Sequence, residues 1–346
     1  MSNHPKYTCS PGHTRIISTG VYLPEGRISS RELMEQLDSP QRFGLNRNWL
    51  ARLTGVRERC VADDHLQPSD LAVRAARDAL ARAEIKLADI DALIFAGVFR
   101  DFHEPATAHI VAHKLGANIP TAFDVSNACH SFEDALHIMD ALIAAGQVKY
   151  GLIVTGETSY RMRHEAINRL QQTTDRELFM ELCAGLNVGD CGAAMIVGAK
   201  KDPHVGFMGF MKESRSHYYH YSTSGPACSD HLLKVWMTPL VDEAISMGEA
   251  MFPAFMDHLG WSRNDIKACV SHQASTSQIQ RMAGYMDVDP ALFVETISTM
   301  GNLISGNATV GLHILAERQQ LKPGDKLVLV GGGSGIVGSH MGLIWG

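Results

Sequence analysis

Short apolar runs that end in small residues recur along the chain and predict buried strands. They are "DALIFAGV" (91–98), "YGLIVTGE" (150–157), "AAMIVGA" (193–199), "IKACVSH" (266–272) and "KLVLVGGG" (326–333). Apolar runs of this length are typical of strands that are covered on both faces of a sheet.

Helical stretches lie between these runs. Residues 69–85 carry apolar side chains at helical spacing, with Ser69 or Asp70 as the expected N-cap. Residues 131–148 repeat apolar positions three and four apart, and the helix is expected to end near Gly146. The alternation of strands and helices predicts an α/β architecture with helices packed over a sheet.

The chain also contains a faint internal repeat. "LADIDALIFAG" (87–97) resembles "RNDIKACVSHQ" (263–273), and "VKYGLIVTGE" (148–157) resembles "GDKLVLVGGG" (324–333). Buried strands use few residue types, so chance is an alternative, but two pairs in register favour duplication. Two similar halves would form a site at their junction, with Cys129 and Asn302 at roughly corresponding places before a helix. Because no Pro/Gly-rich linker separates them, we expect one packed body.

Composition narrows the classes of protein. The 346 residues are 45% apolar and carry a net charge of −6, which allows a large core and argues against nucleic acid as the main partner. No apolar run is long enough to span a bilayer, and the N-terminus has no apolar signal region. The seven cysteines are scattered and never spaced C-x-x-C, which favours a reduced, cytoplasmic protein over a disulfide scaffold or zinc module.

One cysteine lies where a reactive thiol would be expected. Cys129, in "DVSNACHSF" (124–132), falls between a predicted strand and a predicted helix. Free N–H groups and the dipole at a helix N-terminus lower a thiol pKa and can hold an oxyanion. The alternative is an ordinary buried cysteine that only packs.

Two further polar residues follow predicted strands or turns. His272 ends the strand 266–272, where α/β folds place their sites, and Asn302 lies in the turn of "TMGNLISGNATVGL" (299–312). A core histidine and a helix-capping asparagine are the ordinary alternatives. The glycine run 331–335 lacks the pattern of a nucleotide-binding loop.

The sequence gives little support for a metal site. The stretch 214–231 holds His217, His220, Cys228 and His231, but it lacks a second well-spaced ligand pair, so we expect no bound metal. The methionine-rich stretch 247–261 predicts an amphipathic helix.

Taken together, the order of these motifs resembles the thiolase-fold condensing enzymes, and most closely β-ketoacyl-acyl-carrier-protein synthase III. The likeness covers nearly the whole chain. The similar segments are "STGVYLPEGRISSREL" (18–33), "NWLARLTGVRER" (48–59), "AFDVSNACHSF" (122–132), "VGDCGAAMIV" (188–197), "HQA" (272–274), "GN" (301–302) and "LKPGDKLVLVGGGSG" (321–335).

The resemblance implies a thiolase-like α/β fold of two duplicated halves in α-β-α-β-α layers. Residues 1–200 would form the half with the nucleophile, and residues 201–346 the half with the histidine and asparagine. It also implies a homodimer that pairs the sheet edge near the nucleophile across a two-fold axis, with a partner residue able to line the acyl pocket.

The resemblance further implies a reaction. Cys129 would accept an acyl group from acyl-CoA, and His272 and Asn302 would stabilise the enolate formed when a malonyl thioester, carried on acyl carrier protein, loses carbon dioxide. Backbone N–H groups of Cys129 and Gly332 would hold the second oxyanion. Trp49 would stack on coenzyme A with Arg52 nearby, and no metal or other cofactor would be needed. Fatty acid or polyketide-like biosynthesis is the implied setting.

Several residues depart from the family pattern. Ser275 and Ser277 replace the Asn and Arg of "HQANxR", Leu53 stands where the family has Arg, and His130 replaces a small residue. These changes indicate a diverged member. An acyltransferase that passes the acyl group to a hydroxyl, amine or thiol, with His272 as base, remains open. A non-catalytic partner subunit is a further alternative, but it would not need all three catalytic residues.

Overall fold

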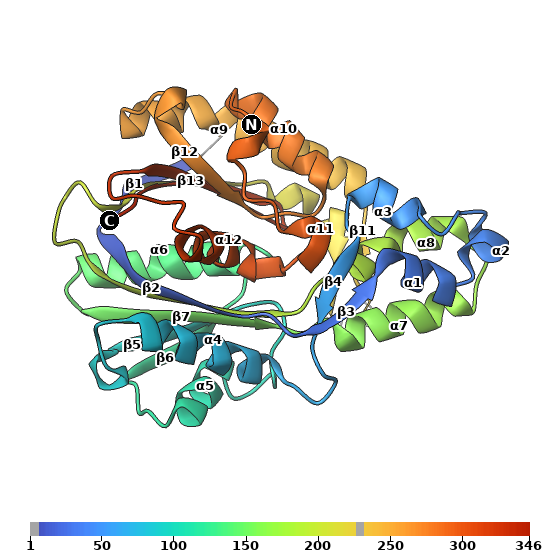
Figure 1. Cartoon of the computed structure of the whole chain (residues 1–346), viewed down its shortest axis with the longest axis horizontal. Coiled ribbons are helices and arrows are strands. Elements are labelled where there is room, and N and C mark those ends of the chain that lie inside the picture. The colour runs from blue at the N-terminus through green and yellow to red at the C-terminus, as the bar shows by residue number, and fades with distance from the viewer. Residues whose placement is uncertain (1–6, 226–231) are drawn as a thin grey trace.

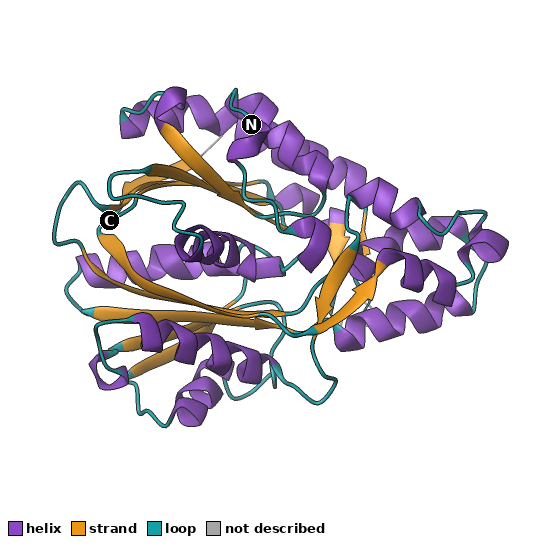
Figure 2. Ribbon diagram, in the orientation of Figure 1, coloured by secondary structure: helices purple, strands orange, loops and turns teal. Residues whose placement is uncertain are grey.

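A computed structural model describes residues 7–225 and 232–346, which fold into two five-stranded sheets with helices between and outside them (Figures 1 and 2). The first sheet has the order β2 (Thr14–Tyr22), β8 (Cys191–Ala199), β7 (Tyr150–Glu157), β5 (Ala92–Ala96) and β6 (Thr121–Val125). The second has the order β1 (Tyr7–Pro11), β9 (Gly206–Ser214), β14 (Val337–Ile344), β13 (Lys326–Gly333) and β12 (Ile266–Ser271).

The two sheets repeat one pattern of pairing. β5 pairs with β7 in parallel and β7 with β8 antiparallel, just as β12 pairs with β13 in parallel and β13 with β14 antiparallel. Short 3₁₀ helices with the same capping arrangement, η1 (Leu87–Asp89) and η4 (Arg263–Asp265), precede β5 and β12. The internal repeat found in the sequence is therefore a structural duplication.

Helices form three layers around the sheets. α6 (Ser131–Ala144) and α12 (Asn307–Glu317) lie between the sheets, and the main apolar core joins them to both (Figure 1). α4 (Pro68–Arg82) and α5 (Thr107–Leu115) pack against the other face of the first sheet. α9 (Met237–Leu259) and α10 (Thr276–Met286) do the same for the second. This is the α-β-α-β-α arrangement predicted from the sequence.

A smaller group of elements gathers at one end of the molecule, at the right of Figure 1. It comprises β3 (Gly26–Ser29), β4 (Glu58–Val61), α1 (Ser30–Gln36), α2 (Ser39–Phe43), α3 (Trp49–Thr54), α7 (Tyr160–Gln171) and α8 (Arg176–Leu182). The remaining elements are η2 (Cys183–Asn187), η3 (Ser216–Tyr221), β10 (Ser222–Thr223), β11 (Lys234–Val235), η5 (Pro290–Leu292), α11 (Ile297–Met300) and η6 (Ile304–Gly306).

The start of α4 differs from the prediction. Gln67 is the N-cap, Pro68 is the first helical residue, and Asp70 accepts a hydrogen bond from the Gln67 N–H. Ser69 lies inside the first turn and donates to Asp101 instead. Proline suits the first helical position because it has no N–H to satisfy, so the helix begins earlier than Ser69.

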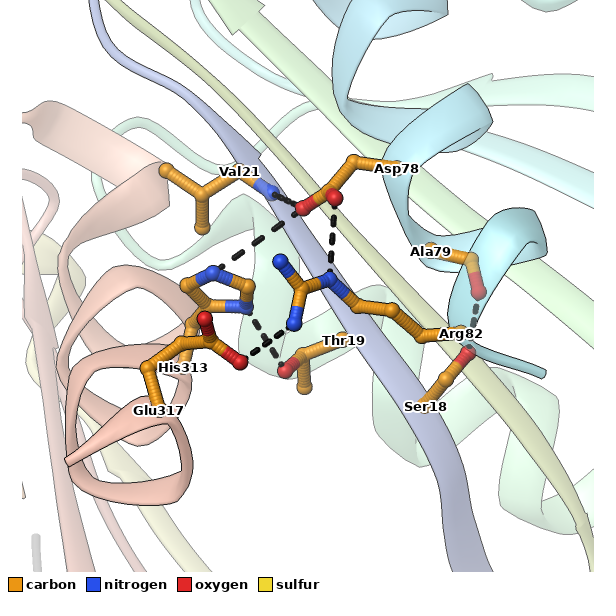
Figure 3. A network of polar contacts seen from close by, with 8 residues as sticks. All are labelled: Ser18, Thr19, Val21, Asp78, Ala79, Arg82, His313 and Glu317. Atoms are coloured by element: carbon orange, nitrogen blue, oxygen red, sulfur yellow. Dashed lines mark hydrogen bonds and ion pairs between the residues drawn. The ribbon is translucent and has the colours of Figure 1, made fainter. Parts of the chain in front are cut away.

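Polar contacts connect the two halves beside β2 (Figure 3). His313 of α12 contacts Thr19 of β2 at 3.1 Å and Asp78 of α4 at 3.9 Å, and Arg82 of α4 contacts Glu317 of α12. α12 is therefore held against the first half by the Arg82–Glu317 ion pair and the polar contacts of His313 as well as by the core. Among the helices of the described residues, none is both long and apolar enough to cross a bilayer.

Candidate active site

The turn that carries Cys129 joins β6 to α6. Ala128 has a φ of 51°, the His130 N–H donates to the Asn127 carbonyl at 3.1 Å, and the Ser131 hydroxyl accepts from the Asn127 N–H at 2.8 Å. A positive φ is strained for alanine, and such strain is typical of functional turns. The result places Cys129 immediately before the first turn of α6.

The glycine strand β13 packs against this turn. A Cβ on Gly331 would lie 2.9 Å from the His130 ring, and one on Gly333 would lie 3.0 Å from the His130 backbone nitrogen. His130 is itself buried, and its Nε2 contacts the Ser339 hydroxyl at 2.7 Å. The glycines are therefore needed because any larger residue would push on the nucleophile turn.

The prediction of a lowered thiol pKa at Cys129 is wrong for this structure. Part of the side chain is accessible, but protein atoms surround it closely enough that burial raises the pKa to about 12, with Glu157 and Glu133 adding to the rise. Desolvation and negative charge outweigh the helix N-terminus here. The thiol must therefore lose its proton as it attacks, rather than beforehand.

Both of these glutamates are buried and hold their protons unusually tightly. Burial raises the pKa of each carboxyl to about 7. Glu157 accepts from the Ser305 hydroxyl at 2.5 Å and from the Val98 N–H at 3.1 Å, whereas Oε2 of Glu133 has no hydrogen-bond partner among the described residues. Two groups that titrate near neutral pH therefore lie beside the nucleophile.

His272 follows directly after β12 and is buried. Its backbone N–H donates to the Val330 carbonyl at 2.9 Å. Its ring Nδ1 lies 3.1 Å from the side-chain amide nitrogen of Asn307 and 3.3 Å from the Ile304 carbonyl. Burial lowers the pKa of the imidazole to about 4, so the ring is neutral at physiological pH. The contacts engage Nδ1 and leave Nε2 for a substrate.

Asn302 lies in the turn between α11 and η6. Its side-chain oxygen accepts from the Ile304 N–H at 2.9 Å and from the Asn307 amide at 3.1 Å. Among the described residues, no group accepts a hydrogen bond from its amide nitrogen. The side chain is therefore held by its oxygen with its nitrogen available as a donor.

Ile304 connects all three predicted catalytic residues. Cys129 packs in an apolar cluster with Ile304, whose N–H binds Asn302 and whose carbonyl faces His272. Its φ of 54° is a strained value for a β-branched residue. The other members of the cluster are Phe99, Met162, Val188 and Leu233. The structure thus gathers Cys129, His272 and Asn302 around one apolar wall.

The residues predicted to bind coenzyme A and the residue predicted to hold the oxyanion lie in different parts of the molecule. Gly332 lines a small cavity together with His272, and a Cβ there would meet nothing within 4 Å. Trp49 begins α3 and packs edge-to-face on Phe179 at 5.6 Å, while exposed Arg52 lines an open surface groove. The roles of these three residues stay predictions.

The departures from the family pattern have local explanations. Ser275 is the N-cap of α10 and its hydroxyl lies 2.9 Å from that of Ser277, so these residues start a helix. Leu53 is 47% exposed on α3, next to Arg52. Of the four histidine and cysteine residues weighed as metal ligands, Cys228 and His231 lie outside the described residues. Within the described ones, no cluster of three such ligands occurs.

The sequence reasoning missed three functional candidates: Asn307, Glu133 and Glu157. Glu157 could have been found from the sequence, because a charged residue at the end of an otherwise apolar strand lies where sites form. Asn307 and Glu133 follow Asn302 and Cys129 closely in the sequence, but only the packing of α12 and α6 between the sheets buries their side chains at the site.

Comparison with known proteins gives the family. Residues 123–215 match the model of 3-oxoacyl-[acyl-carrier-protein] synthase III, and residues 256–345 match the model of its C-terminal part. An acyl-CoA:acyl-CoA alkyltransferase of Xanthomonas campestris is 31% identical over 92% of this chain and 94% of its own. A β-ketoacyl-[acyl-carrier-protein] synthase III of Thiobacillus denitrificans is 28% identical over 93% and 96%.

Solved structures agree with these relatives. Cerulenin-bound OleA of Xanthomonas campestris matches with a TM-score of 0.90 and 27% identity, covering 97% of this chain and 98% of that one. The same protein has also been solved with lauric acid and lauroyl-CoA bound. Sequence models, relatives and fold all indicate one group of enzymes. The chain therefore belongs, as a diverged member, to the 3-oxoacyl-[acyl-carrier-protein] synthase III family of thiolase-fold condensing enzymes.

Proposed function

We propose that this enzyme transfers an acyl group from acyl-CoA to Cys129 and joins it to a malonyl thioester with loss of carbon dioxide. The observation that carries the proposal is the arrangement around Ile304. A partly buried cysteine lies beside a neutral histidine and an asparagine, each with one nitrogen that no described residue engages. Such nitrogens are suited to hold a thioester oxygen as negative charge develops on it.

The reaction balances without a cofactor. In the first step the Cys129 sulfur replaces coenzyme A on the acyl carbon, and the thiol proton leaves with the released coenzyme A thiol. In the second step, the bond between the malonyl α-carbon and its carboxyl group breaks, and carbon dioxide leaves. His272 and Asn302 donate hydrogen bonds to the thioester oxygen of the enolate that results. The enolate carbon attacks the acyl carbon, and the Cys129 sulfur departs and takes up one proton from solvent.

A second acyl-CoA in place of the malonyl thioester is the other candidate. It is favoured by the 31% identical relative of Xanthomonas campestris, which is an acyl-CoA:acyl-CoA alkyltransferase. That reaction breaks a C–H bond instead of losing carbon dioxide, so it needs a base for the α-proton. His272 and Asn302 supply the two donors that decarboxylation needs, whereas a base for the α-proton would have to be a further group, such as Glu133 or Glu157 beside Cys129, which is why decarboxylative condensation is proposed first.

Intact-protein mass spectrometry tests the proposal. The enzyme is incubated with a panel of acyl-CoA thioesters and then chased with malonyl-CoA, with malonyl carrier protein, or with a second acyl-CoA. We expect an acyl adduct that the malonyl chase discharges as a β-ketoacyl product with one carbon dioxide per turnover. Discharge by the second acyl-CoA without carbon dioxide would instead support the alternative.

Matched cysteine variants locate the adduct. Cys129→Ala is expected to abolish it, whereas Cys9→Ala, at an exposed cysteine on β1, is expected to leave it unchanged. An adduct of equal yield in Cys129→Ala would move the nucleophile elsewhere. An adduct that only an alcohol, amine or thiol removes would show acyl transfer to a heteroatom and overturn condensation.

A further inference from the structure

The side chain of Asn307 touches both catalytic polar residues at once. It lies in the first turn of α12 and is 2% exposed. Its amide nitrogen is 3.1 Å from His272 Nδ1, 3.1 Å from Asn302 Oδ1 and 3.0 Å from the Ile304 carbonyl oxygen. No reaction step described above uses this residue.

The surroundings fix which way the Asn307 amide points. Asn302 Oδ1 already accepts from the Ile304 N–H, so it is an oxygen, and the Ile304 carbonyl is an oxygen as well. Turning the Asn307 amide over would place its own oxygen against both. The nitrogen must therefore face inward, even though Oδ1 of Asn307 is left without a partner among the described residues.

This orientation controls the tautomer of His272. The imidazole is neutral, so one ring nitrogen carries the proton and the other accepts. Nδ1 has the Asn307 amide as donor at 3.1 Å and the Ile304 carbonyl as acceptor at 3.3 Å. The donor is the closer partner, so the shorter contact assigns Nδ1 as the acceptor, with the two amide hydrogens of Asn307 shared among Nδ1, Asn302 Oδ1 and the Ile304 carbonyl.

The same contacts orient the side-chain amide of Asn302. Its oxygen is held by Asn307 and by the Ile304 N–H, so its amide nitrogen is directed away from both. We propose that Asn307 is a positioning residue that keeps the His272 proton on Nε2 and directs the Asn302 amide outward, so that two N–H groups face one thioester oxygen. The inference rests on the proposed function, because the step that benefits is enolate formation. Acylation of Cys129 does not depend on it.

Substitution of Asn307 tests the tautomer directly. In Asn307→Asp, a carboxylate replaces the donor, so the His272 proton should move to Nδ1. In Asn307→Ala, the Ile304 carbonyl is the remaining partner of Nδ1 and should have the same effect. Nitrogen NMR of ¹⁵N-histidine-labelled enzyme distinguishes the two tautomers, and His272→Gln identifies the resonances. Thr309→Val, at a buried residue of the same helix whose hydroxyl has no partner among the described residues, is the matched control.

Kinetics supply a second readout. We expect both Asn307 variants to slow condensation about 100-fold, the loss typical of one oxyanion donor, while the rate of Cys129 acylation changes only a few-fold. Thr309→Val should change neither rate. In the kinetics, equal losses in the rates of acylation and condensation would contradict the proposal. In the NMR spectra, so would a wild-type His272 that carries its proton on Nδ1, or Asn307 variants in which the His272 tautomer is unchanged. Should the wild type form no acyl adduct, the proposed function fails, while the NMR result still decides the role of Asn307.

Discussion

At the scale of single residues, the charge state of the Cys129 thiol depends on carboxyl groups that the reaction itself does not use. Burial accounts for most of the raised pKa, and Glu157 and Glu133 raise it further. Glu133 is the simpler of the two to change, because Glu157 also accepts hydrogen bonds from Ser305 and from the backbone. A free enzyme whose Cys129 thiol stays protonated between turnovers is protected from oxidation and alkylation.

Removing the Glu133 charge should make the thiol more acidic. In Glu133→Gln, the carboxylate that opposes thiolate formation is absent, so the pH midpoint for alkylation of Cys129 by iodoacetamide should fall by roughly one unit. The rate is followed by intact-protein mass from pH 7 to 11, and because the wild-type thiol pKa is about 12, the shift of the midpoint is measured as the displacement of the rising part of the rate profile along the pH axis. Glu177→Gln, at an exposed position on α8, serves as the control and should leave the midpoint unchanged. An unshifted midpoint in Glu133→Gln would show that Glu133 does not act on the thiol.

The same substitution should change stability in a pH-dependent way. The folded pKa of Glu133 is about 7 and the unfolded value is 4.5, so the folded state binds more protons between these limits. Stability from this group is therefore present below pH 4.5 and is lost as the pH rises toward 7. Glu133→Gln should raise the free energy of unfolding by up to about 3 kcal/mol at pH 8 and hardly at all at pH 4. Denaturant titrations at both pH values measure it, and an equal effect at both would contradict the sign.

At the scale of elements, α4 lies unusually close to the first sheet. A Cβ on Gly192 of β8 would lie 2.1 Å from the Leu71 carbonyl oxygen, and one on Gly156 of β7 would lie 1.8 Å from that of Pro68. Gly20 of β2 meets the same helix at 2.2 Å. On the helix side of this contact, the buried side chains are small: Ala72, Ala75, Ala76 and Ala79. Glycine on three neighbouring strands and alanine on the helix together set the spacing of this layer.

Adding one methyl group at this contact should destabilise the fold. Gly192→Ala places a Cβ against backbone atoms that cannot move aside, so we expect a loss of about 3 kcal/mol or more in the free energy of unfolding. Gly284→Ala is the matched control, since Gly284 is an exposed residue of α10 with nothing within 4 Å of a Cβ. That substitution should stabilise by about 0.5–1 kcal/mol, because alanine favours helix more than glycine does. Thermal unfolding of both variants would reveal whether the two effects have opposite signs.

At the scale of the whole molecule, the first sheet ends in a strand that has no neighbour on one side among the described residues. β6 is the edge strand, and it leads directly into the turn of Cys129. On the loop between β5 and α5, Phe102 is 61% exposed. An unpaired edge and an exposed aromatic side chain fit the homodimer that the family resemblance implies, in which two β6 strands pair across a two-fold axis.

A proline on the free edge should weaken such a dimer. The Thr121 N–H donates to the Asp91 carbonyl and the Val125 carbonyl accepts from the Gly97 N–H, so odd-numbered residues of β6 bond inward to β5. The backbone groups of Ala122 therefore point outward. Ala122→Pro removes one outward N–H and should convert the dimer to monomer in light scattering at micromolar concentration, with an unchanged circular dichroism spectrum. A wild-type chain that is monomeric under these conditions would contradict the dimer.

The sequence by itself determined the order of strands and helices, the duplication and the three catalytic candidates. Strand β7 and strand β13 occupy the predicted residues, because apolar runs and glycines report local conformation and burial directly. Cys129, His272 and Asn302 could be found because each follows a strand or turn in a family pattern.

Only the tertiary structure decided the electrostatics of the site. The thiol pKa at Cys129 rises rather than falls, because α6 is buried between two sheets and brings Glu133 with it. The contact of Asn307 with His272 likewise depends on how α12 packs beside β12. Desolvation and hydrogen bonding act through space between segments far apart in the chain, so no local pattern of residues encodes them.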